Sequence, residues 1–450
     1  MKKINITEFI DDIGVTKVTW VIFVLLGLTM ILDNYEFGLA PYTMPQIAKE
    51  FNLTAVETGS IASWNLLGLV LGGMSAGLIS DRFGRKKAVM LAAFIYSVFT
   101  PLVYFVPDFT WYCIIRFTGG LGLGAALPVC ITLMSEFAPT KRRGVFITST
   151  MAFFLFGGVI TGTAAIYVIP VYGWRMMYLI GGAAIIVLFL LAAFLRESPQ
   201  WQITHGKIDE AIDTMKALEK SAGRAVTEWT KDDIFVPPPA KKSGVAALFT
   251  PEYRKQTIGL WLMYFFSCCV LYAIMSWMPT LLYTVKGLSL KMSYIFSFSQ
   301  NVAASIACVL TGLMADKLGR RVNIYLGYCL IILIFPLMAF ANGLQVLFLT
   351  VFAVGFAVNY SLNTAQPIVA EYYRPEVRNT GVSFASGVGR FGGFVGPLMV
   401  GLMRQNGFSF QTIIMLCIVP ALLGMLVLRF LVTEETRGKT HNYSAEGIKL

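Results

Sequence analysis

Long runs of apolar residues, separated by short polar breaks, recur along the whole chain. The hydrocarbon core of a bilayer is about 30 Å thick and needs roughly 20 apolar residues per spanning helix, which is the length of these runs. The pattern predicts an all-α integral membrane protein with twelve transmembrane helices. The predicted spans, whose ends are defined to within several residues, are roughly 18–41, 56–79, 88–106, 110–134, 145–168, 173–195, 256–285, 291–314, 322–341, 345–370, 380–403 and 409–432.

Composition supports the same fold class. Hydrophobic residues make up 56% of the chain and charged residues only 14%, which leaves too little polar surface to cover a soluble globule. The net charge of +11 would suit a nucleic-acid partner, but the cations are distributed as membrane topology requires. With both termini in the cytoplasm, nearly all Lys and Arg residues outside the spans are cytoplasmic. We therefore expect a multi-pass protein of the cytoplasmic (inner) membrane with no nucleic-acid partner. The outward-facing exceptions are Lys49, Arg175, Lys286, Lys291 and Arg404.

Neither histidine nor cysteine usage indicates a metal site. The two histidines, His205 and His441, lie in cytoplasmic segments, which excludes a histidine-based metal or proton site within the membrane. The seven cysteines lie in or beside predicted spans, and we interpret them as small packing residues. We expect no metal, no cofactor and no catalytic residue. The cysteines are Cys113, Cys130, Cys268, Cys269, Cys308, Cys329 and Cys417.

Distinctive polar and glycine positions recur at one constant offset, which is the separation of Gly77 and Gly312 along the chain. This repeat predicts two pseudo-symmetric bundles of six helices, with substrate between them near the midplane. The corresponding positions are Gly77, Asp81, Gly84 and Arg85 with Gly312, Asp316, Gly319 and Arg320; Glu136 and Arg143 with Glu371 and Arg378; and Phe156 to Gly158 with Phe391 to Gly393.

The repeat also predicts the domain organisation. Two cytoplasmic ends flank the bundles, and the linker between them contains an amphipathic helix near Ile208 to Leu218 followed by an extended Pro237 to Pro239. The predicted parts are an N-terminal segment, 1–16; a first bundle, 17–195; a linker with short helices, 196–255; a second bundle, 256–432; and a tail, 433–450.

The loop from Gly77 to Lys86, with Asp81, Arg82, Gly84 and Arg85, resembles the signature loop of the major facilitator superfamily, and Gly312 to Arg321 repeats it. The resemblance covers essentially the whole chain. It implies a transporter with a cytoplasmic latch of charged residues; the alternative is that these charges only set orientation. The residues implied for the latch are Gly77, Asp81, Gly84, Arg85, Glu136 and Arg143, and Gly312, Asp316, Gly319, Arg320, Glu371 and Arg378.

Other motifs narrow the resemblance. Segments Glu197 to Trp201 and Glu435 to Gly438 are similar to signatures of sugar porters and metabolite–proton symporters. Asp33 and Glu36, with Trp277 and Pro279, resemble the aromatic acid–proton symporters and nicotinate transporters more closely. Two departures are notable. Cys268 and Cys269 stand where sugar porters carry a glutamine pair, and Gln300 and Asn301 are the polar residues where some aromatic-acid permeases carry a histidine.

Three ionisable residues in the first bundle predict a proton-coupling device: Asp33, Glu36 and Arg116. A charge at mid-bilayer costs roughly 2.5–3.5 kcal/mol on insertion scales, so each needs a partner or a function. Asp33 and Arg116 fall at nearly one depth, roughly 12 Å and 9 Å below the outer boundary. We predict that Asp33 pairs with Arg116 when ionised, that burial favours protonated Glu36, and that protonation releases the arginine. The alternative is a permanent structural ion pair.

Arg390 is the candidate substrate ligand, together with Arg116. The repeat places it opposite Leu155, so the charge occurs in one half only, and a guanidinium can form two parallel hydrogen bonds to a carboxylate. The alternative is a structural arginine bonded to carbonyl groups or an acid. Aromatic and amide side chains expected near the cavity are Tyr35, Trp64, Tyr264, Trp277, Tyr360, Gln300 and Asn301.

The predicted function is proton-coupled symport of a small organic monoanion, with an aromatic carboxylate such as a hydroxybenzoate or nicotinate as the best candidate. Its expected partners are that substrate, the proton and membrane lipid, and we expect a monomer. One alternative is a carrier of a sugar, polyol or organic cation that uses Asp33 and Glu36 as binding acids. A non-transporting receptor would usually have a larger cytoplasmic domain, and an enzyme would need a nucleophile, base or metal constellation that the sequence lacks.

Overall fold

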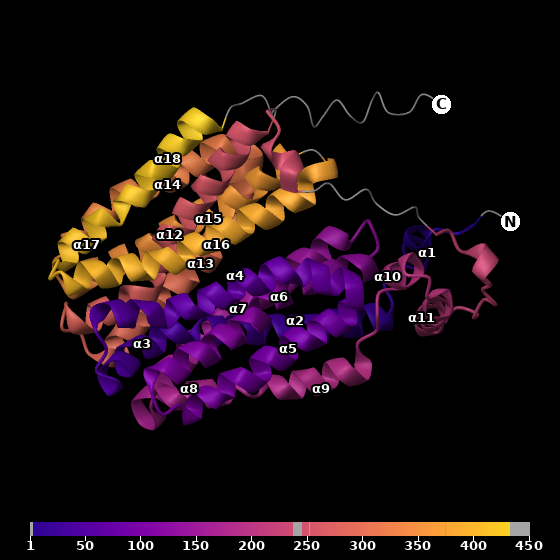
Figure 1. The fold of residues 1–450 in the computed structure, drawn as a ribbon, viewed down its shortest axis with the longest axis horizontal. Helices are drawn as coiled ribbons and strands as arrows, with labels where there is room; N and C mark the ends of the chain where they lie inside the picture. Colours follow the sequence, from indigo (N-terminus) through magenta and orange to yellow (C-terminus); the bar gives the residue numbers. More distant parts are fainter. Residues whose placement is uncertain (1–2, 237–244, 252, 374, 433–450) are drawn as a thin grey trace. The chain divides into compact units, whose positions relative to one another are not determined.

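The computed structural model describes residues 3–236, 245–251, 253–373 and 375–432. The described backbone is helical apart from short connections and one isolated bridge between Ile4 and Ile234, which confirms the all-α class (Figure 1). The side chains of residues 247, 315, 316, 320, 366, 370–372 and 375–379 lie outside the description.

The chain divides into two compact units. The first consists of residues 1–39 and 67–240, and the second of residues 40–66 and 241–450. Helix α4 (Ala55–Phe83) therefore contributes its beginning to the second unit and its end to the first. The domain boundaries expected from the sequence remain a prediction.

In the first unit, α5 packs along α6, and α2 packs along α7. Their interfaces bury small and apolar residues, so the close packing of spanning helices builds the core in which the polar residues lie. The long helices are α2 (Lys17–Phe37), α5 (Arg85–Leu102), α6 (Phe109–Phe137) and α7 (Arg143–Tyr172), followed by α8 (Trp174–Gly181) and α9 (Ala184–Phe194); the short η1 is Val103–Phe105.

In the second unit, α12 packs along α16, and α13 packs along α15. Its helices are α3 (Leu39–Glu50), α12 (Arg254–Thr284), α13 (Leu290–Leu318), α14 (Arg320–Ala339), α15 (Leu344–Tyr372), α16 (Pro375–Gln405), α17 (Phe410–Leu416) and α18 (Ile418–Leu431), with a short η3 (Val245–Phe249).

The helix bounds confirm the repeat. The first and last residues of α13 lie as far along the chain from those of α4 as Gly312 lies from Gly77. The same separation relates the first and last residues of α15 to those of α6. The sixth and twelfth predicted spans are each broken into two helices, at Gly182 and at Cys417, and these breaks also correspond in the repeat. Because Pro420 has no N–H to donate, a continuous helix through Cys417 would lose a hydrogen bond in any case.

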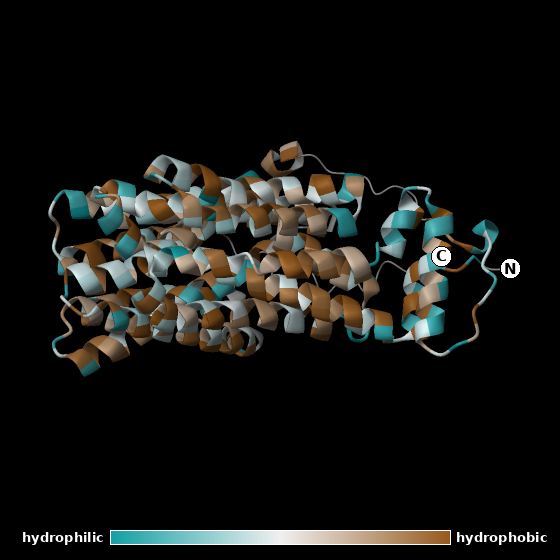
Figure 2. Ribbon diagram, turned by 90° about the horizontal axis from the view of Figure 1, so that it is seen from below, coloured by the Kyte–Doolittle hydropathy of each residue, from teal (hydrophilic) through white to brown (hydrophobic). Residues whose placement is uncertain are grey.

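The predicted spans agree with the helices. Within the described residues, eleven helices are long and apolar enough to cross a membrane, and the remaining predicted span, 380–403, lies within α16. The first span is longer than expected, because α2 continues through Gly38 into α3. Figure 2 shows hydrophobic residues along the long helices and hydrophilic ones concentrated at their ends and in the linker.

A small subdomain outside the spanning helices joins the N-terminal segment to the linker. Helix α1 (Ile6–Ile13) buries its apolar face, and its Phe9 ring meets Trp229 edge-on at 5.7 Å. The predicted linker helix is confirmed as α11 (Ile208–Ser221), after α10 (Pro199–Thr204) and before η2 (Lys231–Asp233). Arg224 pairs with Asp12, and two hydrogen bonds from Thr140 hold the pKa of Asp11 below its ordinary value. The predicted extended Pro237 to Pro239 lies outside the described residues.

Candidate functional site

The interior acid cluster consists of Asp33 and Glu36 on α2 and Arg116 on α6, all within the first unit. Their side chains are 3%, 0% and 0% exposed. Arg116 Nη2 donates to the backbone carbonyl of Glu36 at 3.2 Å, so the cation contacts the helix that carries both acids. The structure therefore brings together groups that are 80 residues apart in sequence. The ion pair with Asp33 and its role in proton coupling remain predictions.

The two oxygens of the Glu36 carboxyl group have different surroundings. The Thr100 hydroxyl on α5 donates to its Oε2 atom. Its Oε1 atom has no hydrogen-bond partner among the described residues. A Cβ atom at Gly181, where α8 ends, would stand 3.6 Å from that oxygen. The carboxyl group thus has one satisfied oxygen and one oxygen that faces a glycine.

Tyrosines surround Arg116, and two of them were not predicted from the sequence. The guanidinium lies over the Tyr178 ring, 5.3 Å from its centroid, and the Tyr178 hydroxyl is 2.9 Å from that of Tyr112. Tyr35, expected near the substrate, donates to the Met177 carbonyl at 2.9 Å, and its contact with substrate stays a prediction. The signal for Tyr112 was its position one helical turn before Arg116 on the same face of α6.

Arg390 lies on α16, partly buried beside α12 in the second unit. Its charge acts electrostatically on Tyr264, Cys268 and Tyr272 of α12. Within the described part of the chain, it forms no hydrogen bond or ion pair. A partly buried guanidinium with no acid paired to it among the described residues is suited to an anionic ligand.

A narrow recess lies one helical turn from Arg390. Its empty space of about 140 Å³ is partly open to the surroundings and is too tight for a water molecule, so helices α12, α15 and α16 would have to separate before it admitted a ring. Its lining residues are Tyr264, Val369, Val382, Ala385 and Ser386.

The other predicted substrate residues in the second unit have differing environments. Gln300 is fully buried, and neither atom of its amide has a hydrogen-bond partner among the described residues. Asn301 Nδ2 donates to the Tyr42 hydroxyl at 2.8 Å, and Trp277 Nε1 donates to the Pro397 carbonyl at 2.8 Å. Tyr360 bonds Asn323, and Trp64 is 38% exposed. Substrate contacts of these residues stay predictions.

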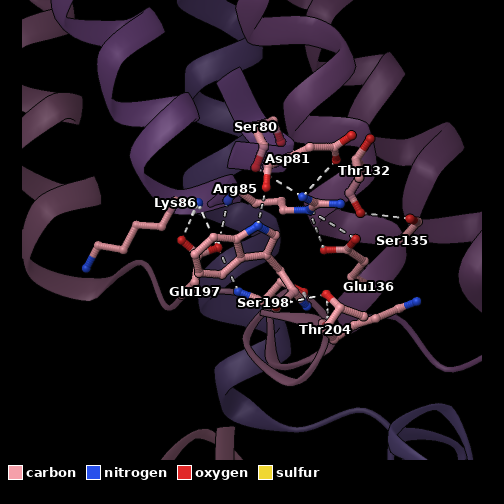
Figure 3. Close-up of polar contacts among 12 residues, drawn as sticks. Ser80, Asp81, Arg85, Lys86, Thr132, Ser135, Glu136, Glu197, Ser198 and Thr204 are labelled. Carbon is pink, nitrogen blue, oxygen red and sulfur yellow. Dashed lines mark hydrogen bonds and ion pairs between the residues drawn. The ribbon is translucent and has the colours of Figure 1, made fainter. Parts of the chain in front are cut away.

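The signature loop between α4 and α5 is fixed by the start of the linker (Figure 3). Glu197 Oε1 accepts from the backbone N–H groups of Arg85 and Lys86 at 2.8 and 3.1 Å, which caps the N-terminus of α5. Gly84 has φ +102°, and a Cβ atom there would stand 2.2 Å from Glu197 Oε2. Trp201 Nε1 adds a bond to the Asp81 carbonyl at 2.8 Å.

Arg85 joins two of the predicted latch acids. Its Nη1 atom lies 3.1 Å from Asp81 Oδ1, and its Nε atom lies 3.2 Å from Glu136 Oε1 (Figure 3). Arg143 forms no ion pair within the described residues, and its charge acts on Asp11. A Cβ atom at Gly77 would have no atom within 4 Å, so close helix contact does not explain that glycine.

In the repeated loop, two latch residues are described. Gly319 has φ +80° immediately before α14, as Gly84 does before α5, and Gly312 has open space around it like Gly77. The side chains of Asp316, Arg320, Glu371 and Arg378 lie outside the described residues. No group of metal-binding side chains occurs in the part of the chain that the structure describes.

A family model described as the Major Facilitator Superfamily matches residues 26–344 and 301–449. The chain belongs to the Major Facilitator Superfamily. Like the superfamily's other members, it is a multi-pass membrane transporter rather than an enzyme, and a small molecule is its substrate.

Transporters of small aromatic molecules are among the similar proteins. The niacin transporter NiaP of Acinetobacter baylyi is 30% identical over 450 residues, covering 97% of this chain and 98% of that protein. The benzoate transport protein of the same organism is 28% identical over 96% of this chain and 93% of that protein. Its 4-hydroxybenzoate transporter PcaK is 28% identical over 92% and 91%.

Solved superfamily structures share the fold. The Escherichia coli xylose transporter XylE, in a partially occluded inward-open conformation, matches with a TM-score of 0.72 at 18% identity and covers 93% of this chain and 100% of its own. A bacterial homologue of the human lysosomal transporter Spinster also reaches 0.72, at 17% identity over 93% and 98%.

Proposed function

We propose that this superfamily member is a proton-coupled symporter of a small aromatic monocarboxylate that works by alternating access. The observation that carries the proposal is the full burial of Glu36 and Arg116 inside a membrane-spanning bundle, where Arg116 donates to the backbone carbonyl of Glu36. Such a costly arrangement requires a function, and a carboxyl group beside a cation can exchange a proton with a change of partner.

The substrate class is supported from two directions. Relatives that match nearly the whole chain are named as carriers of niacin, benzoate and 4-hydroxybenzoate. Arg390 supplies a guanidinium with no acid beside it among the described residues, and Tyr264 supplies an aromatic ring next to it. Together they offer a carboxylate a cation and offer an aromatic ring a stacking surface.

Membrane orientation and assembly belong to the same proposal. We place both termini and the loop of Asp81 and Arg85 in the cytoplasm, because that orientation keeps most cations inside. The host membrane is then the cytoplasmic membrane. A single chain carries both bundles, so a monomer surrounded by lipid is the functional unit we propose.

Proteoliposomes with an imposed pH gradient test this function. Radiolabelled 4-hydroxybenzoate, benzoate and nicotinate should accumulate when the outside is acidic, and a protonophore should abolish accumulation. Unlabelled benzoate should compete, whereas xylose and a quaternary amine should not. Competition by the sugar or the amine, with none by benzoate, would instead support the alternative carrier of a neutral or cationic substrate.

A further inference from the structure

The Glu36 carboxyl group has unequal oxygens, and this inequality comes from residues outside α2. Thr100 on α5 donates to Oε2, while Oε1 faces Gly181 at the end of α8 and has no hydrogen-bond partner among the described residues. Thr100 and Glu36 are both 0% exposed, so water does not substitute for the contact. The environment thus singles out Oε1 as the oxygen available to a proton.

Gly181 leaves the space that Oε1 needs. A Cβ atom there would stand 3.1 Å from Thr100 Cγ2 and 3.6 Å from Glu36 Oε1, so a methyl group would press on Thr100 and fill the space beside Oε1. The glycine is not needed for the local break in the helix, because Leu416 holds the equivalent place at the break between α17 and α18.

The second bundle shows that the helical scaffold does not require the polar residues that surround Glu36 in the first bundle. At the offset of the repeat, Pro101 corresponds to Pro336, which fixes the register of α5 and α14. Six polar residues of the first bundle lie at or near Glu36, and the residue at the corresponding position of the second bundle is in each case apolar or a cysteine. All six counterparts are buried. The pairs are Asp33 with Cys268, Glu36 with Leu271, Tyr96 with Ile331, Thr100 with Phe335, Arg116 with Val351 and Tyr178 with Ile413.

Building on the proposed proton coupling, we propose that Thr100 and Gly181 are positioning residues for proton binding at Glu36. The Thr100 hydroxyl holds Oε2 between α2 and α5, Gly181 keeps the space beside Oε1 open, and the proton forms its O–H bond at Oε1. Protonation gives a neutral acid, and release of the same proton on the other side restores the carboxylate.

The charged and titratable groups around this carboxyl group come from four helices. Asp33 and Tyr35 lie on α2 itself, Tyr96 faces it from α5, Arg116 lies on α6, and Tyr178 of α8 contacts Arg116. Thr100 differs from all of them because it cannot change charge. Its replacement therefore tests positioning without adding or removing a titrating group.

The transport test compares accumulation with exchange in proteoliposomes, using 4-hydroxybenzoate as the probe. Thr100→Val keeps the shape and removes the hydroxyl, and we expect gradient-driven accumulation to fall at least about tenfold, as loss of a hydrogen bond to a charged group predicts. Exchange of internal for external probe should stay within about twofold. Thr100→Ser should restore accumulation. Gly181→Ala should behave like Thr100→Val.

The matched control is Ser97→Ala on the same helix, since among the described residues that buried hydroxyl bonds only the Phe94 carbonyl of its own helix. It should leave both activities unchanged. Equal losses of accumulation and exchange in Thr100→Val, or normal accumulation in it, would overturn the role of Thr100.

An infrared measurement separates this inference from the proposed function, because it needs no substrate. In a pH-difference spectrum of purified protein in lipid, the carboxyl band that disappears in Glu36→Gln should move to higher frequency in Thr100→Val and return in Thr100→Ser. Should wild type transport none of the probes while the band responds in this way, the symport proposal fails and the positioning of Glu36 stands. An unmoved band refutes the positioning, whatever the transport result.

Discussion

Gly84 shows at the scale of one residue how the signature loop depends on its linker. Its backbone has φ +102°, and a Cβ atom would stand 2.2 Å from the carboxylate that caps α5. We therefore expect Gly84→Ala to lower stability by about 1–3 kcal/mol, the cost of a strained conformation, and more if Glu197 is displaced. Thermal unfolding of the purified protein measures the change.

The control for that substitution lies in the same loop. Gly77→Ala adds a methyl group where no atom lies within 4 Å, inside a helix that alanine favours. It should leave the unfolding temperature unchanged or raise it slightly. A similar loss of stability in both variants would show that neither the positive φ of Gly84 nor its contact with Glu197 matters.

Candidate site residues were predictable where a charged side chain occurs within a span that lipid would require to be apolar. Asp33, Glu36, Arg116 and Arg390 are charges within apolar runs, so the sequence alone identified them. Thr100 carried no such signal, because a threonine in a spanning helix normally bonds its own backbone, as Thr150 does to Phe146. Only the structure shows that this hydroxyl is turned toward Glu36.

At the scale of elements, the length and hydropathy of apolar runs were sufficient to predict the long helices from the sequence. They were not sufficient to predict where these helices are interrupted. A bilayer requires about 20 apolar residues per span whatever its neighbours are, so the spans follow from the sequence. Helix α1 instead depends on tertiary contacts. An isolated helix of eight residues is unstable in water, and α1 is held by linker residues that are distant in the chain, such as Arg224.

Helix α1 provides a prediction at this scale. Phe9→Ala removes the ring that packs on Trp229, and truncating a buried phenylalanine costs about 3–5 kcal/mol. Hydrogen exchange of residues 4–14 and 224–235 should therefore accelerate by roughly a hundredfold or more, while α2 and α7 keep their protection. Glu8→Gln alters an exposed side chain of the same helix and should change nothing. Acceleration that extends into α2 and α7 would contradict a subdomain that unfolds independently of the spanning helices.

At the scale of the whole molecule, the two repeats differ in the charged residues that they carry within their spans, which suggests that they have different functions. The bundles share helix bounds at a constant offset, yet the acids and Arg116 occur only in the first and Arg390 only in the second. A duplicated scaffold does not need either set for folding, because each set is replaced by apolar side chains or a thiol in the other half. We infer that the first half carries the proton and the second half binds the carboxylate.

This division predicts opposite kinetic signatures for the two halves. Asp33→Asn and Glu36→Gln should abolish accumulation driven by a pH gradient but leave exchange of 4-hydroxybenzoate largely intact, because the substrate ligand is untouched. Arg390→Lys should reduce both accumulation and exchange by about tenfold or more, since lysine cannot form the paired hydrogen bonds that a guanidinium offers a carboxylate. Arg404→Lys, at a half-buried arginine that bonds the Phe408 carbonyl at the end of α16, is the matched control and should retain both activities. If neutralising the acids of the first half weakened exchange as strongly as Arg390→Lys does, the acids would belong to the binding site itself, and coupling and binding would not be divided between the halves.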